Sequence, residues 1–225
     1  MLAAGDTASP QADQALATLC TSYWYPLYAY LRRTGQSPAD AQDAVQGFFA
    51  HLLQNQRLAA VHPARGKFRS FLLTALRNFL ADERRKQTAQ KRGGTVITIP
   101  LEVQTAEERY RIEPVDRRDP ETLYERRWAM MVLERVLERL KAEAADARTA
   151  ERFAQLQPFL LADDASPSYA EIGRRLGMTE GAVKMAVLRL RQRGREIFRD
   201  EIASTVASEQ DVEDEVRHLF TVLMN

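Results

Sequence analysis

Basic and amide side chains recur at helical spacing in two separate parts of the chain. Between residues 68 and 87, four such side chains fall on one side when the sequence is wound at about 100° per residue: Arg77, Asn78, Arg84 and Arg85. A second series follows the cap residue Thr179: Lys184, Arg189, Arg191, Arg193 and Arg195. Guanidinium and ammonium groups bind phosphates, and Arg, Lys and Asn also bind base edges. Both series therefore have the chemistry for nucleic-acid contact.

Each series also has an interpretation without a ligand. Cations at the C-terminal end of a helix interact favourably with the helix dipole, which explains Arg84, Arg85 and Lys86 but leaves Arg77 and Asn78 unexplained. The second series could belong to a solvated basic helix in any helical bundle. The sequence favours nucleic-acid contact for both.

The helix at 68–87 needs an apolar side to hold its polar stripe in place. Phe68, Leu72, Ala75, Leu76 and Phe79 share one side, while Ser70, Thr74 and Ala81 join the basic side. This separation predicts an amphipathic helix that is anchored in a core and exposes a stripe growing more basic toward its end.

The second series follows a helix-turn-helix pattern in "SYAEIGRRLGMTEGAVKMAVLRLRQ". Gly173 is expected where two helices cross, Gly177 makes the turn, and Thr179 caps the second helix. Ile172, Leu176, Met178 and Val183 supply the apolar positions. The second helix is then expected to be a recognition helix for a DNA major groove.

Other elements follow from the same reasoning. We expect an all-α protein with helices at 12–33 (interrupted near Pro26), 38–54, 121–145 and 149–161, and a short acidic helix from 210. Ser37 should cap the helix at 38–54, whose polar face carries Asp40, Asp43, Gln46 and Gln54. Residues 88–120, with the extended run "TVITI", are expected to form a linker with little structure of its own.

Composition restricts the classes further. The net charge is +1, yet Lys and Arg gather at 84–92 and 174–199 and acidic residues at 200–215. The single cysteine, Cys20, excludes an intramolecular disulfide and suits a reducing cytoplasm. No signal peptide or membrane span is expected. The three histidines, His51, His62 and His218, are scattered and no phosphate-binding glycine loop is present, so we expect no enzyme, cofactor or metal site.

The two basic helices and their surroundings resemble one family. "DAQDAVQGFFAHLLQ" with "GKFRSFLLTALRNFLADERRKQ" resembles region 2 of bacterial sigma-70-family sigma factors of the extracytoplasmic-function type, and "PSYAEIGRRLGMTEGAVKMAVLRLRQRGRE" resembles their region 4. The resemblance implies two small helical domains: region 2 at 12–92 and region 4 at 121–205, joined by a flexible linker at 93–120. Residues 206–225 would form a C-terminal extension helix.

The resemblance also implies site residues and partners. Region 2 would bind the clamp helices of core RNA polymerase through Asp40, Asp43 and Gln46. It would read and open the promoter −10 element through Lys67, Phe68, Arg69, Thr74, Arg77, Asn78, Arg84 and Arg85. Region 4 would bind the −35 element through Thr179, Lys184, Arg189, Arg191 and Arg193. An anti-sigma factor or another regulator is a common partner in this family, and nothing in the sequence identifies one.

Two features depart from the family pattern. Ala182 and Ala186 stand where the family commonly has Thr and Arg in the recognition helix. The tail from 210 extends past the usual end and is expected to pack Leu219, Phe220 and Leu223 on region 4 or to dock a regulator. Two other functions stay open at this point: a helix-turn-helix regulator that never touches polymerase, and a signalling adaptor that binds only proteins.

Overall fold

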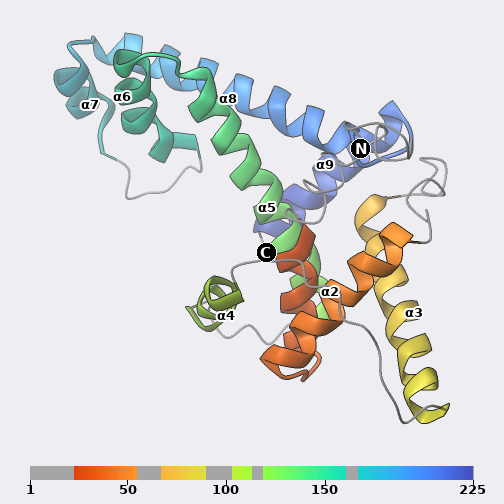
Figure 1. Cartoon of the computed structure of the whole chain (residues 1–225). Coiled ribbons are helices and arrows are strands. Elements are labelled where there is room, and N and C mark those ends of the chain that lie inside the picture. Colours follow the sequence, from red (N-terminus) through yellow and green to blue (C-terminus); the bar gives the residue numbers. More distant parts are fainter. Residues whose placement is uncertain (1–22, 55–66, 90–102, 113–118, 161–166, 225) are drawn as a thin grey trace. The chain divides into compact units, whose positions relative to one another are not determined.

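The computed structural model describes residues 23–54, 67–89, 103–112, 119–160 and 167–224, and every regular element in these ranges is a helix (Figure 1). The expected all-α class is confirmed. No helix in these ranges has both the length and the apolar composition that crossing a membrane requires. The described chain forms two compact units: one reaches Met131 and resumes at Ala203, and the other is Val132–Ile202.

The first unit is built on three helices: 23–33, α2 (Pro38–Gln54) and α3 (Phe68–Ala89). Pro26 lies in the first of these without breaking it, and residues 12–22 lie outside the described ranges. α2 begins as expected, since the Ser37 hydroxyl accepts a hydrogen bond from the Asp40 amide at 3.1 Å. Gly47 on α2 leaves room for the ring of Phe79 on α3, because a Cβ there would lie 3.3 Å from that ring.

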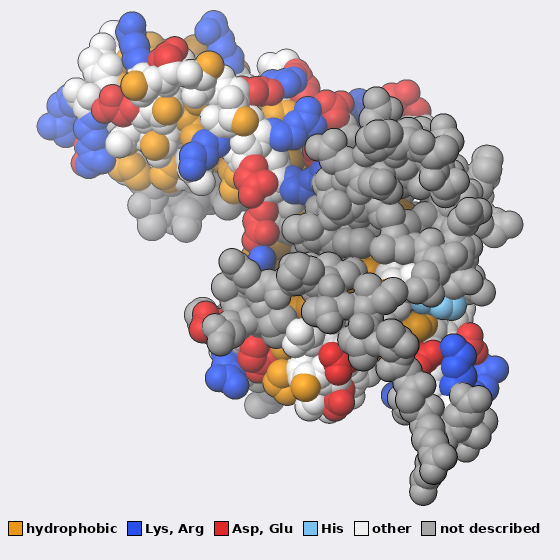
Figure 2. Space-filling model, viewed as in Figure 1, with side chains coloured by type: hydrophobic (Ala, Val, Ile, Leu, Met, Phe, Trp, Pro, Cys, Tyr) orange, Lys and Arg blue, Asp and Glu red, His pale blue; other side chains and the backbone are white. Residues whose placement is uncertain are grey.

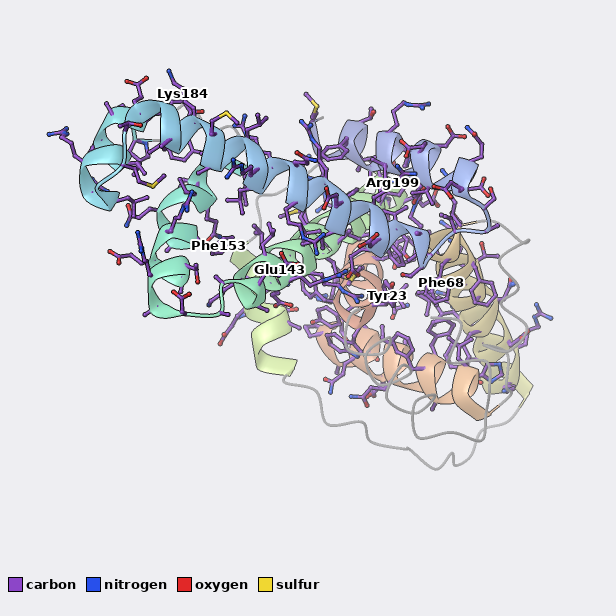
Figure 3. All side chains as sticks on the ribbon, turned by 90° about the horizontal axis from the view of Figure 1, so that it is seen from above. Tyr23, Phe68, Glu143, Phe153, Lys184 and Arg199 are labelled. Atoms are coloured by element: carbon purple, nitrogen blue, oxygen red, sulfur yellow. The ribbon has the colours of Figure 1, made fainter. Side chains whose placement is uncertain are left out.

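Aromatic rings fill the centre of the first unit. Tyr23 stacks on Trp128 with ring centroids 4.3 Å apart. The Tyr23 ring also lies 5.4 Å from the ring of Phe68, and both residues are labelled in Figure 3. Trp24 stacks on Tyr28 at 4.9 Å. These rings are almost completely buried and join helix 23–33, α3 and the first part of α5 (Pro120–Glu143).

A helix in the expected linker corrects the sequence prediction. α4 (Val103–Ile112) forms within 93–120, while the "TVITI" run lies outside the described residues. Glu107 of α4 accepts hydrogen bonds from the Tyr28 hydroxyl at 2.6 Å and from Arg32 Nε at 3.0 Å. The burial of Tyr28 and its bond to the Glu107 carboxylate raise the pKa of the phenol to about 12. These contacts hold α4 against helix 23–33, which periodicity in a ten-residue segment could not indicate.

The C-terminal helix α9 (Glu209–Met224) lies in the first unit with α3 and not in the unit that holds the helix-turn-helix. Its Val212 and Leu219 are buried, and the backbone amide of Phe68 donates to the carbonyl of Thr205, just before α9, at 3.0 Å. The sequence prediction that the tail packs on region 4 therefore differs from the structure. Ion pairs with α3, described below, provide the physical reason.

The second unit contains the end of α5, α6 (Ala147–Leu156), a 3-10 turn η3 (Gln157–Leu160), α7 (Tyr169–Leu176) and α8, Glu180–Ala203. The turn has the expected helix-turn-helix geometry. Gly177 ends α7 in the left-handed region at φ +63°, and Thr179 caps α8 by accepting from the Ala182 amide at 3.2 Å. The core beneath is formed by Leu156, Phe159, Ile172, Val183, Ala186 and Val187.

Gly173 fixes how closely α7 approaches the turn, so Gly173→Ala should destabilise this unit. An added Cβ would lie 2.6 Å from the backbone carbonyl oxygen of Met178, which a flexible side chain cannot relieve. We expect a loss of roughly 2 kcal/mol, as for overpacking in a core. Hydrogen exchange of the α7 and α8 amides measures it. Gly181→Ala is the matched control, because a Cβ there meets nothing within 4 Å, and equal losses for both variants would contradict the prediction.

Candidate nucleic-acid interface

The polar stripe of α3 is exposed as the sequence predicts. Phe68, Leu72 and Leu76 are at most 4% exposed and face the core. Five residues of the predicted DNA face lie on the exposed side: Thr74, Arg77, Asn78, Arg84 and Arg85. The helix thus separates an apolar side that anchors it from a side rich in hydrogen-bond donors, as a helix docked along a polyanion requires.

Arg77, in the middle of the stripe, is held by partners from two other helices. Its Nε donates to the hydroxyl of Tyr30 at 3.0 Å, and its guanidinium pairs with Glu121 in the first turn of α5. Its charge is therefore matched within the chain, although the side chain remains 43% exposed. These two contacts direct the Arg77 side chain toward helix 23–33 and α5.

The N-terminal end of α3 is enclosed. Phe68 is only 4% exposed inside the aromatic cluster, and Arg69 is equally buried. Arg69 Nε donates to Glu215 of α9 at 2.6 Å, and its guanidinium also pairs with Glu125 of α5. Lys67 Nζ lies 2.7 Å from the other Glu215 oxygen. In this structure Phe68 and Arg69 are not accessible to a nucleic acid.

Glu215 is ionised in this pocket because cations surround it. Its burial alone would raise the pKa of the carboxyl, but hydrogen bonds from Arg69 and Lys67, together with their charges, hold the pKa below its usual value of 4.5. His218 adds a polar contact nearby, with Nε2 3.0 Å from Glu125. Buried between two carboxylates, Arg69 joins α5 and α9 to α3, and the same guanidinium has the charge to bind another anion.

The acidic helix α2 keeps two of its three predicted polymerase contacts at the surface. Asp40 and Asp43 are exposed. Gln46 is 6% exposed, which corrects the expectation that it lies on the polar face. Gln46 directly follows the buried Val45 and precedes the buried Phe49 by one helical turn, so it falls at the edge of the apolar stripe.

The helix-turn-helix presents a mixed basic and apolar surface on the first half of α8. Thr179, Lys184 and Arg189 are exposed, and Lys184 lies on the outer side of the helix (Figure 3). The same stretch exposes Met185 and Leu188 at 50% and 55%. Figure 2 shows Lys and Arg side chains beside apolar ones on the part of the surface formed by α6–α8. Ala186, one of the two departures, is buried in the core, whereas Ala182 is exposed.

Two residues of the predicted −35 set are bound within the unit. Arg191 is half-buried and donates through Nε and Nη2 to the carbonyl of Phe159, at 2.9 and 2.7 Å. Arg193 pairs with Glu143 at 2.6 Å and with Glu196 at 3.0 Å. The contact of Arg191 with Phe159 holds α8 to η3, and the contact of Arg193 with Glu143 holds it to the end of α5. Among the predicted cations, Lys184, which pairs with Glu180 on its own helix at 2.6 Å, and Arg189 are exposed, and the Arg193 side chain is partly exposed at 42%.

Sequence reasoning missed three carboxylates that touch the predicted −10 set. Glu121 contacts Arg77, Glu125 contacts Arg69, and Glu215 contacts both Lys67 and Arg69. The only available signal was the acidic cluster before 215, which contains no information about a partner 146 positions away.

Residues 20–90 match the family described as Sigma-70 region 2, and this match spans helix 23–33, α2 and α3. The match supports a sigma-70-family sigma factor with a role in transcription and promoter recognition, and such a domain implies RNA polymerase and promoter DNA as partners. No curated protein and no solved structure matches the chain.

The buried pair predicts how stability depends on pH. A carboxyl whose pKa is lowered on folding stabilises the fold above its unfolded pKa, near 4.5, and this contribution disappears as the pH falls through the lower folded value. Glu215→Gln should therefore cost roughly 3 kcal/mol at pH 7. The difference from wild type should shrink steadily below pH 4.5. Denaturant titrations followed by circular dichroism measure it, and a difference independent of pH would contradict the prediction.

Proposed function

We propose that the chain is a sigma factor of the extracytoplasmic-function type. It binds core RNA polymerase, recognises the promoter −10 and −35 elements and promotes DNA opening for transcription initiation in the cytoplasm. The observation that carries the proposal is the coincidence of the region 2 match with an exposed Asn/Arg stripe on α3. A helix-turn-helix with a basic first half of α8 follows in the same chain. The proposed role is non-enzymatic and requires no cofactor or metal.

The proposed domains are region 2 within 12–92 and region 4 within 121–205. The compact units support this division only in part, because the beginning of α5 joins the first unit. For region 2, we infer that Asp40 and Asp43 of α2 contact the polymerase clamp helices. Their exposure supports this role, since carboxylates at a rim steer association with a basic partner.

Promoter opening needs cations that hold a displaced strand and groups that bind unstacked bases. On α3, we infer that Thr74, Arg77, Asn78, Arg84 and Arg85 provide these groups along one side of a helix. Lys67, Phe68 and Arg69 complete the set at its N-terminal end, where DNA would have to replace contacts that the chain now makes with itself. Arg84 and Arg85 at the far end would follow the backbone.

Recognition of the −35 element would use the first half of α8. The N-terminal residues of a recognition helix are those that reach base edges, which favours Thr179, Lys184 and Arg189 as the contacts. Arg191 and Arg193 would act by holding α8 in place, as their bonds to Phe159 and Glu143 support. A regulator such as an anti-sigma factor remains a proposed partner without an identified surface.

Run-off transcription with core polymerase on a promoter library tests the proposal directly. A sigma factor produces transcripts that start at one class of promoter and are absent without the chain. A helix-turn-helix regulator that never binds polymerase would bind duplex DNA with a strong salt dependence and give no such transcripts. A chain that acts only on proteins would show neither property.

Arg77→Ala combined with Asn78→Ala should reduce promoter opening by at least about 30-fold while polymerase binding is kept, because each of the two lost contacts costs about 1–3 kcal/mol. Permanganate reactivity of unpaired thymines measures opening. Glu121→Gln is the control, since it removes the ion-pair partner of Arg77 and keeps the cation. If Glu121→Gln loses opening equally, Arg77 acts by fastening α5 and the DNA contact is wrong.

Asp40→Lys combined with Asp43→Lys should weaken binding to core polymerase by at least about tenfold, because like charges would then face the clamp. Glu138→Lys with Glu151→Lys makes the same change in net charge on exposed positions of the second unit. Surface plasmon resonance against immobilised core polymerase compares the two. Unchanged affinity in the α2 variant would exclude this face as the clamp contact.

A further inference from the structure

We propose that α9 is an intramolecular inhibitor of the −10 site. In the free chain, Glu215 occupies an anion site formed by Lys67, Arg69 and the start of α3, and promoter DNA can use that end of α3 only after α9 leaves. The inference rests on the proposed function. It assigns a role to the C-terminal helix, which lies outside the region 2 match.

The contacts at the start of α3 are those of an occupied anion site. Both oxygens of the Glu215 carboxylate are used, one by Arg69 Nε at 2.6 Å and the other by Lys67 Nζ at 2.7 Å. Glu215 is 1% exposed and Arg69 is 4% exposed, so water does not compete for the pair. A DNA phosphate offers the same combination of two oxygens and negative charge to an arginine.

A second contact reaches the same end of the helix. The first amides of an α-helix lack intrahelical acceptors and attract anions. The amide of Phe68, the first residue of α3, donates to the carbonyl of Thr205 at 3.0 Å. The segment from Thr205 to Glu215 therefore pairs with Lys67 and Arg69 and also accepts from the first amide of α3. The proposed function assigns this N-terminal end of α3 to DNA.

The charge of α9 suits competition with a polyanion. Five carboxylates lie between 209 and 215: Glu209, Asp211, Glu213, Asp214 and Glu215. Val212 and Leu219 bury the apolar side of the same helix in the first unit. Docked in this way, α9 blocks the site sterically and adds negative charge beside it, which repels an approaching strand.

Exchange between α9 and DNA would proceed without leaving a buried charge unpaired. Arg69 cannot lose Glu215 freely, because an arginine enclosed in the protein needs an anion beside it. A phosphate that arrives as Glu215 departs supplies one, and Glu125 keeps its contact with the guanidinium meanwhile. In the middle of the stripe, Arg77 pairs with Glu121 in the same manner, although that pair is exposed to water.

The test measures binding of a fluorescein-labelled single-stranded DNA of mixed sequence to the full chain by anisotropy at fixed salt. Glu215→Gln should bind the single-stranded DNA at least about fivefold more tightly than wild type does. Fivefold is the lower end of the affinity change that coupling between two sites usually produces. Asp214→Asn is the matched control, since it removes the same charge from the same helix while its partner is Arg217, 3.3 Å away on α9. The DNA affinity of Asp214→Asn should stay within about twofold of the wild-type affinity.

A second measurement protects the test against a variant that folds poorly. In the wild-type chain, hydrogen exchange of the α9 amides should speed up when the single-stranded DNA is added, because binding displaces the helix. DNA affinity in a folded Glu215→Gln equal to or weaker than that of wild type would overturn the inference. Exchange of the wild-type α9 amides that DNA leaves unchanged would overturn it as well, and Glu215 would then only hold α9 to α3.

The outcomes also separate this inference from the function beneath it. Transcripts that depend on the wild-type chain and core polymerase, combined with equal DNA affinity for wild type and Glu215→Gln, would retain the sigma-factor role and remove inhibition by α9. An absence of DNA binding and of transcripts for every variant, with core polymerase present, would overturn the proposed function and this inference together.

Discussion

Burial of the Arg69 guanidinium is the constraint on which the first unit depends. A charge removed from water needs carboxylates beside it, and Arg69 recruits one from α5 and one from α9. The backbone carbonyl of the same residue accepts from the Tyr124 hydroxyl at 2.9 Å. Helices from the beginning, middle and end of the chain thus meet at a single residue. Apolar packing alone specifies no such meeting point, because it has no direction.

The same arrangement explains why α3 can be both a core helix and a polar surface. Its apolar side rests on the aromatic layer of Tyr23 and Trp128, so the helix needs no support from its polar side. The cations there are consequently available for exchange between partners. Contacts with Glu121 and Glu215 replace bulk water in the free chain, and phosphates would replace those contacts in a complex. An ion pair suits such exchange better than an apolar contact, since either anion satisfies it.

Local signals in the sequence were sufficient for the features that a few neighbouring residues determine. The two sides of α3, the Ser37 cap of α2 and the turn at Gly177 all follow from spacing and residue type, and all are confirmed. Features that depend on distant partners were missed. Glu107 stabilises α4 by bonding to residues 75 and 79 positions earlier, and Glu215 reaches back 146 positions. Gln46 was misplaced because a residue beside an apolar stripe is buried or exposed according to its neighbours in space.

The distribution of aromatic residues has an optical consequence. Both tryptophans, Trp24 and Trp128, are buried in the first unit, and the second unit contains Tyr169 as its single tyrosine and no tryptophan. Neither indole N–H has a hydrogen-bond acceptor among the described residues. Tryptophan fluorescence, excited at the long-wavelength edge of the protein absorption band, therefore reports on the first unit alone. The helix-turn-helix could unfold completely without being seen at that wavelength.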